Sequence, residues 1–121
     1  MRERQFVADL VTKTYVPKMF LARQKFPRPK IEPSEIPGII DGLLSQEKFA
    51  SRVKPGMRIA ITAGSRGIAN NALTTKCLAD FCKKQGALPF VVPAMGSHGG
   101  ATAEGQREVL ASYNIVEDYI G

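Results

Sequence analysis

The second half of the chain has the most regular pattern of apolar and polar residues. Residues 57–62 and 88–92 form two short apolar runs, which predict buried β-strands. Each run is followed by a glycine-containing loop and then by a stretch with helical periodicity, residues 72–85 and residues 101–113. This order predicts a βαβ unit with two parallel strands and a right-handed crossover.

Single residues mark where these helices end and begin. Gly86 directly follows the first helix, where a left-handed C-terminal cap is expected. Thr102 is a natural N-cap for the second helix, and Glu104 in its first turn suits the helix dipole. Asn70 and Asn71 are expected to serve the start of the first helix, with contact to a ligand as the alternative.

The first half of the chain has a weaker pattern. Residues 3–16 place apolar side chains at helical spacing and predict an amphipathic helix that ends before Pro17. Residues 18–26 predict a strand, which two prolines stop. Residues 33–50 predict a helix whose first turns are weakened by a proline and two glycines. We therefore place the βαβ core in residues 51–121 and expect the preceding half to belong to the same domain.

Composition narrows the class of protein. A chain of 121 residues is long enough for one domain with its own core. No apolar run approaches the roughly 18–20 residues that span a bilayer, and the N-terminus has no signal-peptide pattern, so we expect no membrane partner. Cys77 and Cys82 are too few for a structural zinc site, and they lie about 140° apart around one helix, so at least one should be core. A reducing cytoplasm is the expected location.

The charge is positive and uneven. The net charge is +6, and residues 1–56 carry 11 Lys and Arg against 6 Asp and Glu, with the excess concentrated between Lys13 and Lys30. We interpret this stretch as a solvated surface, or as one that faces another domain, rather than as a nucleic-acid groove.

The predicted topology brings two loops together. In parallel sheets ligands bind outside the carboxyl ends of the strands, and neighbouring strands lie about 4.8 Å apart. The two glycine-containing loops both follow carboxyl ends, so they should share one rim. We therefore expect Ser65, Arg66, Ser97 and His98 to lie close together.

The first of these loops has the features of an anion site. Glycines at Gly64 and Gly67 let the backbone approach an anion, while Ser65 adds a hydroxyl and Arg66 a planar fork for a carboxylate or phosphate. The loop lacks the Walker and dinucleotide-binding patterns. The alternative is a tight turn with Arg66 in solvent.

The second loop contains the single histidine of the chain. His98 lies between Gly96-Ser97 and Gly99, where no helical or strand face encloses it. Imidazole titrates near neutral pH, which suits a general acid or base. One histidine without nearby cysteines or carboxylates makes a poor metal site, so no metal ligand is assigned. The alternative is a loop histidine bonded to backbone.

These two loops resemble a known family. GSRGIANN at residues 64–71 and PAMGSHGGATAEGQREVL at residues 93–110 are similar to the N-terminal domain of the nickel-dependent lactate racemase family, nearest its uncharacterised relatives. The resemblance extends over residues 50–121 and more loosely over the first half, so residues 1–121 correspond to one domain. It implies an α/β fold with Rossmann-like βαβ layers around a parallel sheet, and a second, C-terminal domain across the active-site cleft.

The resemblance also implies a chemistry. Family members racemise a small hydroxy acid by moving a hydride to a nickel pincer nucleotide and back, while two histidines alternate as base and acid. His98 resembles one of these histidines. Gly64, Ser65, Arg66, Gly96 and Ser97 correspond to the loops that bind the substrate carboxylate or the cofactor phosphate. The cofactor lysine, its metal-binding histidine and the second catalytic histidine have no counterpart in these 121 residues, so we expect the chain alone to be inactive.

Three positions depart from the family pattern. Ala63 stands where lactate racemases have an Asp, and Gly67 and Gly99 replace basic and proline residues. These changes favour a different 2-hydroxy acid or a sugar acid as the substrate of an isomerase. Two further interpretations stay open: an RNA-binding module that uses Gly64–Gly67 as a GxxG loop, and an anion-binding domain without chemistry. An oligomer is compatible with each of them.

Overall fold

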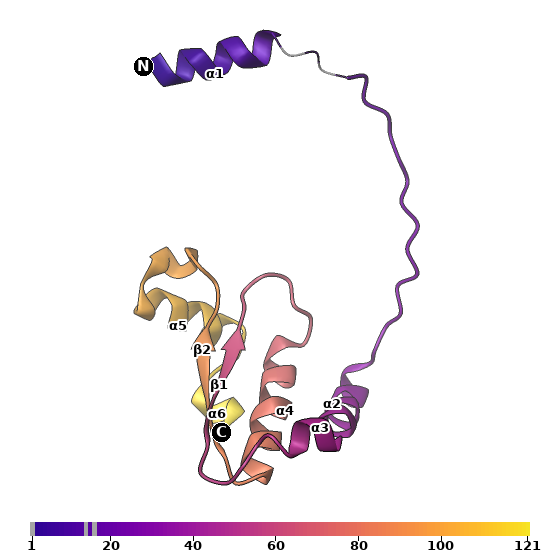
Figure 1. Ribbon diagram of the computed structural model, residues 1–121, viewed down its shortest axis with the longest axis vertical. Coiled ribbons are helices and arrows are strands. Elements are labelled where there is room, and N and C mark those ends of the chain that lie inside the picture. The colour runs from indigo at the N-terminus through magenta and orange to yellow at the C-terminus, as the bar shows by residue number, and fades with distance from the viewer. Residues whose placement is uncertain (1, 14, 16) are drawn as a thin grey trace.

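Two parallel strands form the centre of the fold. In the computed structural model, which describes residues 2–13, 15 and 17–121, strand β1 (Arg58–Ala63) pairs with β2 (Leu88–Pro93), and α4 (Asn71–Lys84) connects them (Figure 1). Ile61 lies opposite Val91 in the register. The predicted parallel pair and the strand–helix–strand order are confirmed, and the domain is a mixed α/β structure.

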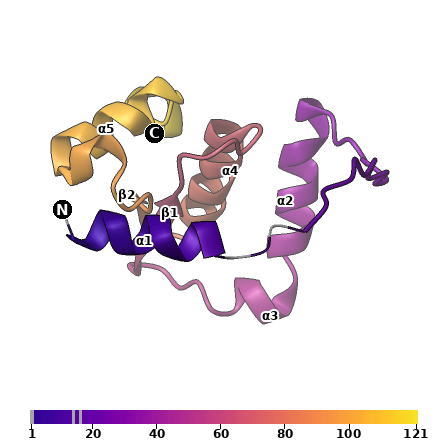
Figure 2. The same ribbon diagram turned by 90° about the horizontal axis from the view of Figure 1, so that it is seen from above.

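The helices pack against one face of this pair. After β2 come the short 3₁₀ helix η2 (His98–Ala101), α5 (Ala103–Ser112) and the single turn α6 (Glu117–Ile120). Figure 2 shows α4 and α5 next to each other along the sheet, with α2 (Ile36–Leu44) beyond α4. No helix among the described residues is both long and apolar enough to cross a bilayer.

The core lies on one face of the sheet. Alternate residues of β1, Ile61 and Ala63, are buried against Ala79 of α4 and Leu110 of α5. Thr62, between them on β1, is exposed, and Phe90 on β2 is exposed as well. The prediction of buried strands is therefore correct for one face of the sheet and wrong for the other, because only one face has helices packed on it.

Local signals place the helix ends where the sequence predicts them. Gly86 ends α4 with φ of +78°, in the left-handed region. Thr102 caps α5, since its side-chain oxygen accepts a hydrogen bond from the Gly105 N–H at 3.1 Å. Of the two cysteines, Cys82 is buried and Cys77 is partly buried, as expected for at least one core position.

The stretch predicted as one helix over residues 33–50 is divided. A 3₁₀ turn, η1 (Pro33–Glu35), precedes α2, and a separate turn, α3 (Glu47–Ala50), follows it. Pro37 lies in the first turn of α2, where its missing N–H has no helical partner to lose. The break before α3 occurs at Gln46, whose backbone is extended with ψ of 136°.

The N-terminal region extends away from the rest of the molecule. Helix α1 (Arg2–Lys13) forms where it was predicted but is shorter, because Tyr15 is not helical; two further residues of the expected helix, 14 and 16, lie outside the described residues. Residues 17–32 run as an extended, exposed segment that leads from α1 to η1 (Figure 1). The strand predicted at residues 18–26 is wrong, because no neighbouring strand supplies hydrogen bonds to this segment within the described chain.

Candidate functional site

The loops after β1 and β2 meet at the carboxyl edge of the sheet. The Ser65 Oγ lies 2.5 Å from Nδ1 of His98. On the other side of the ring, Nε and Nη2 of Arg66 each lie 3.3 Å from Nε2 of His98. The structure therefore brings together three of the four side chains that the topology predicted. Ser97 is exposed next to His98 and caps η2 without a side-chain hydrogen bond to that helix.

Arg66 determines which nitrogen of His98 carries the proton. A guanidinium has hydrogen-bond donors and no acceptor, so Nε2 of His98 must accept from Arg66 and be unprotonated. The hydrogen of the neutral ring is then on Nδ1, which donates it to Ser65 Oγ. The Ser65 hydroxyl hydrogen remains free to donate to a ligand.

The three side chains differ in their access to solvent. Ser65 and His98 are half-buried, whereas Arg66 is exposed. The guanidinium is thus available to an incoming anion, while the ring and hydroxyl behind it are held in place. A planar fork next to a hydroxyl donor suits a carboxylate or a phosphate.

Two side chains hold the first loop in position. The Asn71 side-chain amide donates to the Gly64 carbonyl at 2.9 Å, so this asparagine fixes the loop at the start of α4. The Tyr113 hydroxyl donates to the Ser65 carbonyl at 2.7 Å from the end of α5. The sequence indicated a role for Asn71, because it lies at the start of a predicted helix. Nothing in the sequence indicated the role of Tyr113, because 48 residues separate it from Ser65.

The second loop is fixed by α5. The Gln106 side chain donates to the Gly96 carbonyl at 2.7 Å, and the Thr102 hydroxyl donates to the Gly99 carbonyl at 3.1 Å. Gly99 and Gly105 approach so closely that a Cβ on either would lie within 2.3 Å of the other's backbone. Glycine at both positions is therefore a steric requirement of the loop that contains the histidine.

The site fits an anion better than a metal. No group of three His, Cys, Asp or Glu side chains that could hold a metal ion occurs in the part of the chain that the structure describes. These residues therefore do not fit the nickel of the pincer nucleotide that the resemblance implies, although Arg66 and Ser65 suit a phosphate group. The two cysteines lie in α4 and not in the loops that form the site. Burial raises the pKa of both thiols.

The comparisons with known proteins add no family assignment. No protein-family model, curated protein or solved structure matches the chain. The class of protein defined by the fold and site is an α/β domain with a Ser–His–Arg cluster at the carboxyl edge of a parallel strand pair.

Proposed function

We propose that this chain is one domain of a 2-hydroxy-acid racemase or epimerase, to which it contributes an acid/base histidine and an anion-binding loop. In this proposal His98 exchanges a proton with the substrate hydroxyl, and Arg66 with Ser65 binds the carboxylate. The two strands belong to a Rossmann-like layered sheet that faces a second domain across the substrate. The single observation that supports this assignment is the contact of Arg66 with Nε2 of His98.

This contact links anion binding to proton transfer. A substrate carboxylate that pairs with Arg66 competes with the ring for the guanidinium N–H groups. Once Arg66 turns to the carboxylate, Nε2 has a free lone pair next to the bound acid. A hydroxyl on the carbon next to the carboxylate can then transfer its proton to Nε2. Inversion of the carbinol carbon also needs an acceptor for its hydride, which a cofactor held with the second domain would supply. The residues described account for anion binding and proton transfer only.

The single histidine makes binding directly measurable. With 15N-labelled protein, every imidazole signal in the NMR spectrum belongs to His98. We expect lactate to shift the Nε2 resonance, and propionate, which lacks the hydroxyl, to shift it less. Arg66→Ala should weaken lactate binding by roughly tenfold, near the low end for a charged hydrogen bond because Arg66 is exposed. Arg107→Ala, on the surface of α5, is the matched control and should bind as the wild type does.

Catalysis is tested in an enzyme that carries this domain together with the second domain. His98→Ala should lower racemisation of the substrate by about 10²–10⁴-fold, the usual loss for a general acid or base. Lys48→Ala on α3 is the control for an unrelated surface change. Turnover by His98→Ala within a few-fold of wild type would show that the histidine is not the acid/base group. Anion binding without any racemisation would instead identify a binding domain without chemistry.

A further inference from the structure

Strand β1 has an outer edge with no neighbouring strand in the described chain. At the two ends of the ladder, the Leu88 N–H donates to the Met57 carbonyl at 2.7 Å, and the Ala94 N–H donates to the Ala63 carbonyl at 2.8 Å. Backbone groups alternate in direction along a strand, so the odd-numbered residues of 57–63 face β2. The residues that direct their N–H and C=O groups to the open side are Arg58, Ala60 and Thr62.

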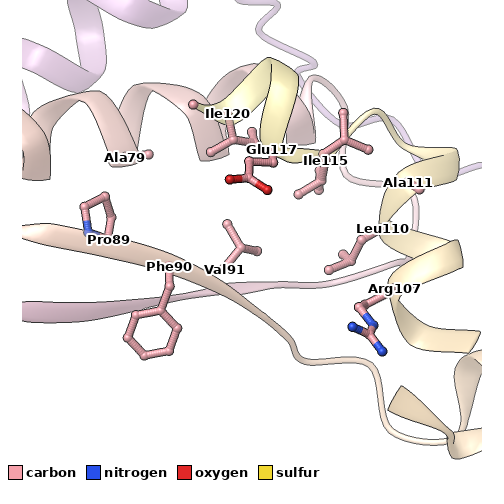
Figure 3. A pocket seen from close by; sticks show the side chains of 12 residues that line it. Ala79, Pro89, Phe90, Val91, Arg107, Leu110, Ala111, Ile115, Glu117 and Ile120 are labelled. Atoms are coloured by element: carbon pink, nitrogen blue, oxygen red, sulfur yellow. The ribbon is translucent and has the colours of Figure 1, made fainter. Parts of the chain in front are cut away.

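The outer edge of β2 is different. The same alternation directs the backbone groups of Pro89, Val91 and Pro93 away from β1. Figure 3 shows the alternation in the side chains, since those of Pro89 and Val91 point toward the helices and that of Phe90 points the opposite way. Proline has no N–H, so Val91 alone has a donor on this edge of the described strand. Natural sheets use prolines to prevent pairing at an edge, so the edge of β1 is the one that can accept a further strand.

Residues 18–26, which we call the arm, have the properties of a strand without a neighbour. The segment is extended and lies outside any helix or sheet (Figure 1). Its apolar side chains are in water, with Met19 exposed to 88% and Phe20 to 87%. Exposed apolar side chains and an extended backbone both favour association with another surface. The arm and the open edge of β1 can therefore supply backbone hydrogen bonds to each other.

The helices lie in a row that follows the order of the strands. Helix α5 is at the β2 end of this row, because its Leu110 lines the same apolar groove as Val91 of β2 (Figure 3). Figure 2 shows α4 next to α5 and α2 beyond α4. The Asp41 carboxylate of α2 contacts the Lys84 ammonium of α4 at 2.9 Å, and Leu44 packs against the same helix. Helix α2 therefore lies at the other end of the row, on the side of the open edge of β1.

The chain connection places the arm on that side as well. The arm is followed by α2 and then by β1. Leu44 of α2 and Ile59 of β1 pack against the cluster that contains Phe81 of α4, so α2 covers the same face of the sheet as α4. Connections of this kind between parallel strands are right-handed in about 98% of cases. Since α4 leads from β1 to β2 on this face, a right-handed connection through α2 must reach β1 from the side opposite β2.

We propose that the arm binds the open edge of β1 in its own chain as a third strand, parallel to β1, and that the structure shows the arm in its undocked position. Residues 27–32, the link from the arm to η1, are within the usual length of roughly 2–6 residues for such loops. The third strand also accounts for the apolar side chains of α2 that remain exposed, Ile39 to 42% and Leu43 to 52%, because a connecting helix packs its apolar side chains on the strands that it connects. This inference is independent of the function proposed for His98.

Amide hydrogen exchange of the full chain, measured residue by residue in 15N NMR spectra, tests the docked arm. The N–H groups of Arg58, Ala60 and Thr62 face water when the edge is open, whereas the Ile61 N–H faces β2 in either state. Docking should slow the exchange of the three edge amides at least about tenfold relative to an unstructured peptide, because their hydrogen bonds to the arm must first open.

Two single proline substitutions in the arm are matched variants. Adjacent residues of a strand direct their N–H groups to opposite sides, so only one of Leu21 and Ala22 can donate to β1. We expect one of Leu21→Pro and Ala22→Pro to accelerate exchange at Ala60 by at least about tenfold, because it removes a hydrogen bond of the pair. The other should leave exchange nearly unchanged, because an edge strand tolerates proline where the N–H would face solvent. Exchange at Ile61 should be equal in both variants, which controls for the integrity of the core.

Two further measurements identify the origin and the direction of the added strand. The slow exchange of Ala60 should not depend on protein concentration, because the arm belongs to the same chain. NOEs between backbone protons of the arm and of β1 should connect residues in the same order along both segments, as in a parallel pair.

Three results would overturn the proposal. The first is exchange of Ala60 at the rate of an unstructured peptide, which would show that the edge stays open in solution. The second is an equal effect of Leu21→Pro and Ala22→Pro on this exchange. The third is protection that rises with protein concentration or NOEs in antiparallel order, which would assign the added strand to a second copy or to a different topology.

Discussion

Replacing Gly105 with alanine tests how the histidine loop is held. In an ordinary helix this change stabilises the protein by at most about 1 kcal/mol, because alanine is the better helix former. Here a Cβ on Gly105 would lie 2.0 Å from the Gly99 carbonyl oxygen and 2.7 Å from its carbon. Side-chain carbons rarely approach other atoms within 3.0 Å, so the Gly99 carbonyl must move by about 1 Å.

The steric cost should exceed the gain in helix propensity. Overpacking of this kind costs about 1–3 kcal/mol, so we expect Gly105→Ala to lower the free energy of unfolding by about 1–2 kcal/mol in urea denaturation. Gly42→Ala is the matched control, because Gly42 lies in α2 with no atom within 4 Å of the new Cβ, and it should raise stability by about 0.5–1 kcal/mol. The NMR signal of His98 should change only in Gly105→Ala. Equal stabilisation by both substitutions would refute the close contact.

Three smaller changes test the surroundings of the site. Thr102→Ala should lower the free energy of unfolding by about 1 kcal/mol through the lost N-cap of α5, measured in urea, and Thr102→Ser should restore most of it. Tyr113→Phe removes the hydrogen bond to the Ser65 carbonyl, so hydrogen exchange should become faster in the loop after β1 while α4 is unchanged; equal exchange in both proteins would show that the bond does not hold the loop. Burial raises the pKa of Cys77 and Cys82, so near pH 8 both thiols should react with iodoacetamide more slowly than free cysteine, and reaction as fast as free cysteine would contradict this. Because their pKa values are raised in the folded state, their contribution to stability is complete below the ordinary thiol pKa and is lost as the pH rises through the folded values.

The fold was predictable where short-range signals agree with the packing. The strands and helices from β1 to α5 begin and end close to the predicted positions, because Gly86 and Thr102 fix two helix boundaries locally. The extended conformation of residues 18–26 shows the limit of such signals. Its apolar and β-favouring composition is that of a strand, but a strand also needs a neighbour, and no local pattern shows whether one is present.

In the candidate site, too, some contacts were predictable from the sequence and others were not. The meeting of Ser65 with His98 followed from topology alone, since the carboxyl ends of two adjacent parallel strands share an edge. The supports from Tyr113 and Gln106 did not, because they depend on how α5 packs against the two loops in three dimensions. Single polar residues on a helix surface give no signal that distinguishes such a contact from exposure to solvent.

The contact between Ser65 and His98 also limits the chemistry that this site supports. A serine next to a histidine is the arrangement of an activated nucleophile, in which the ring nitrogen accepts the hydroxyl proton. Here the donor and acceptor roles are reversed. Arg66 donates to Nε2, so the ring hydrogen is on Nδ1, and Nδ1 donates it to Ser65 Oγ. An anion that draws Arg66 away frees Nε2, the nitrogen that faces the anion and not the serine. In the proposed function, the base made available by binding acts on the ligand itself, so the site favours proton transfer at a bound hydroxy acid over acyl transfer through Ser65.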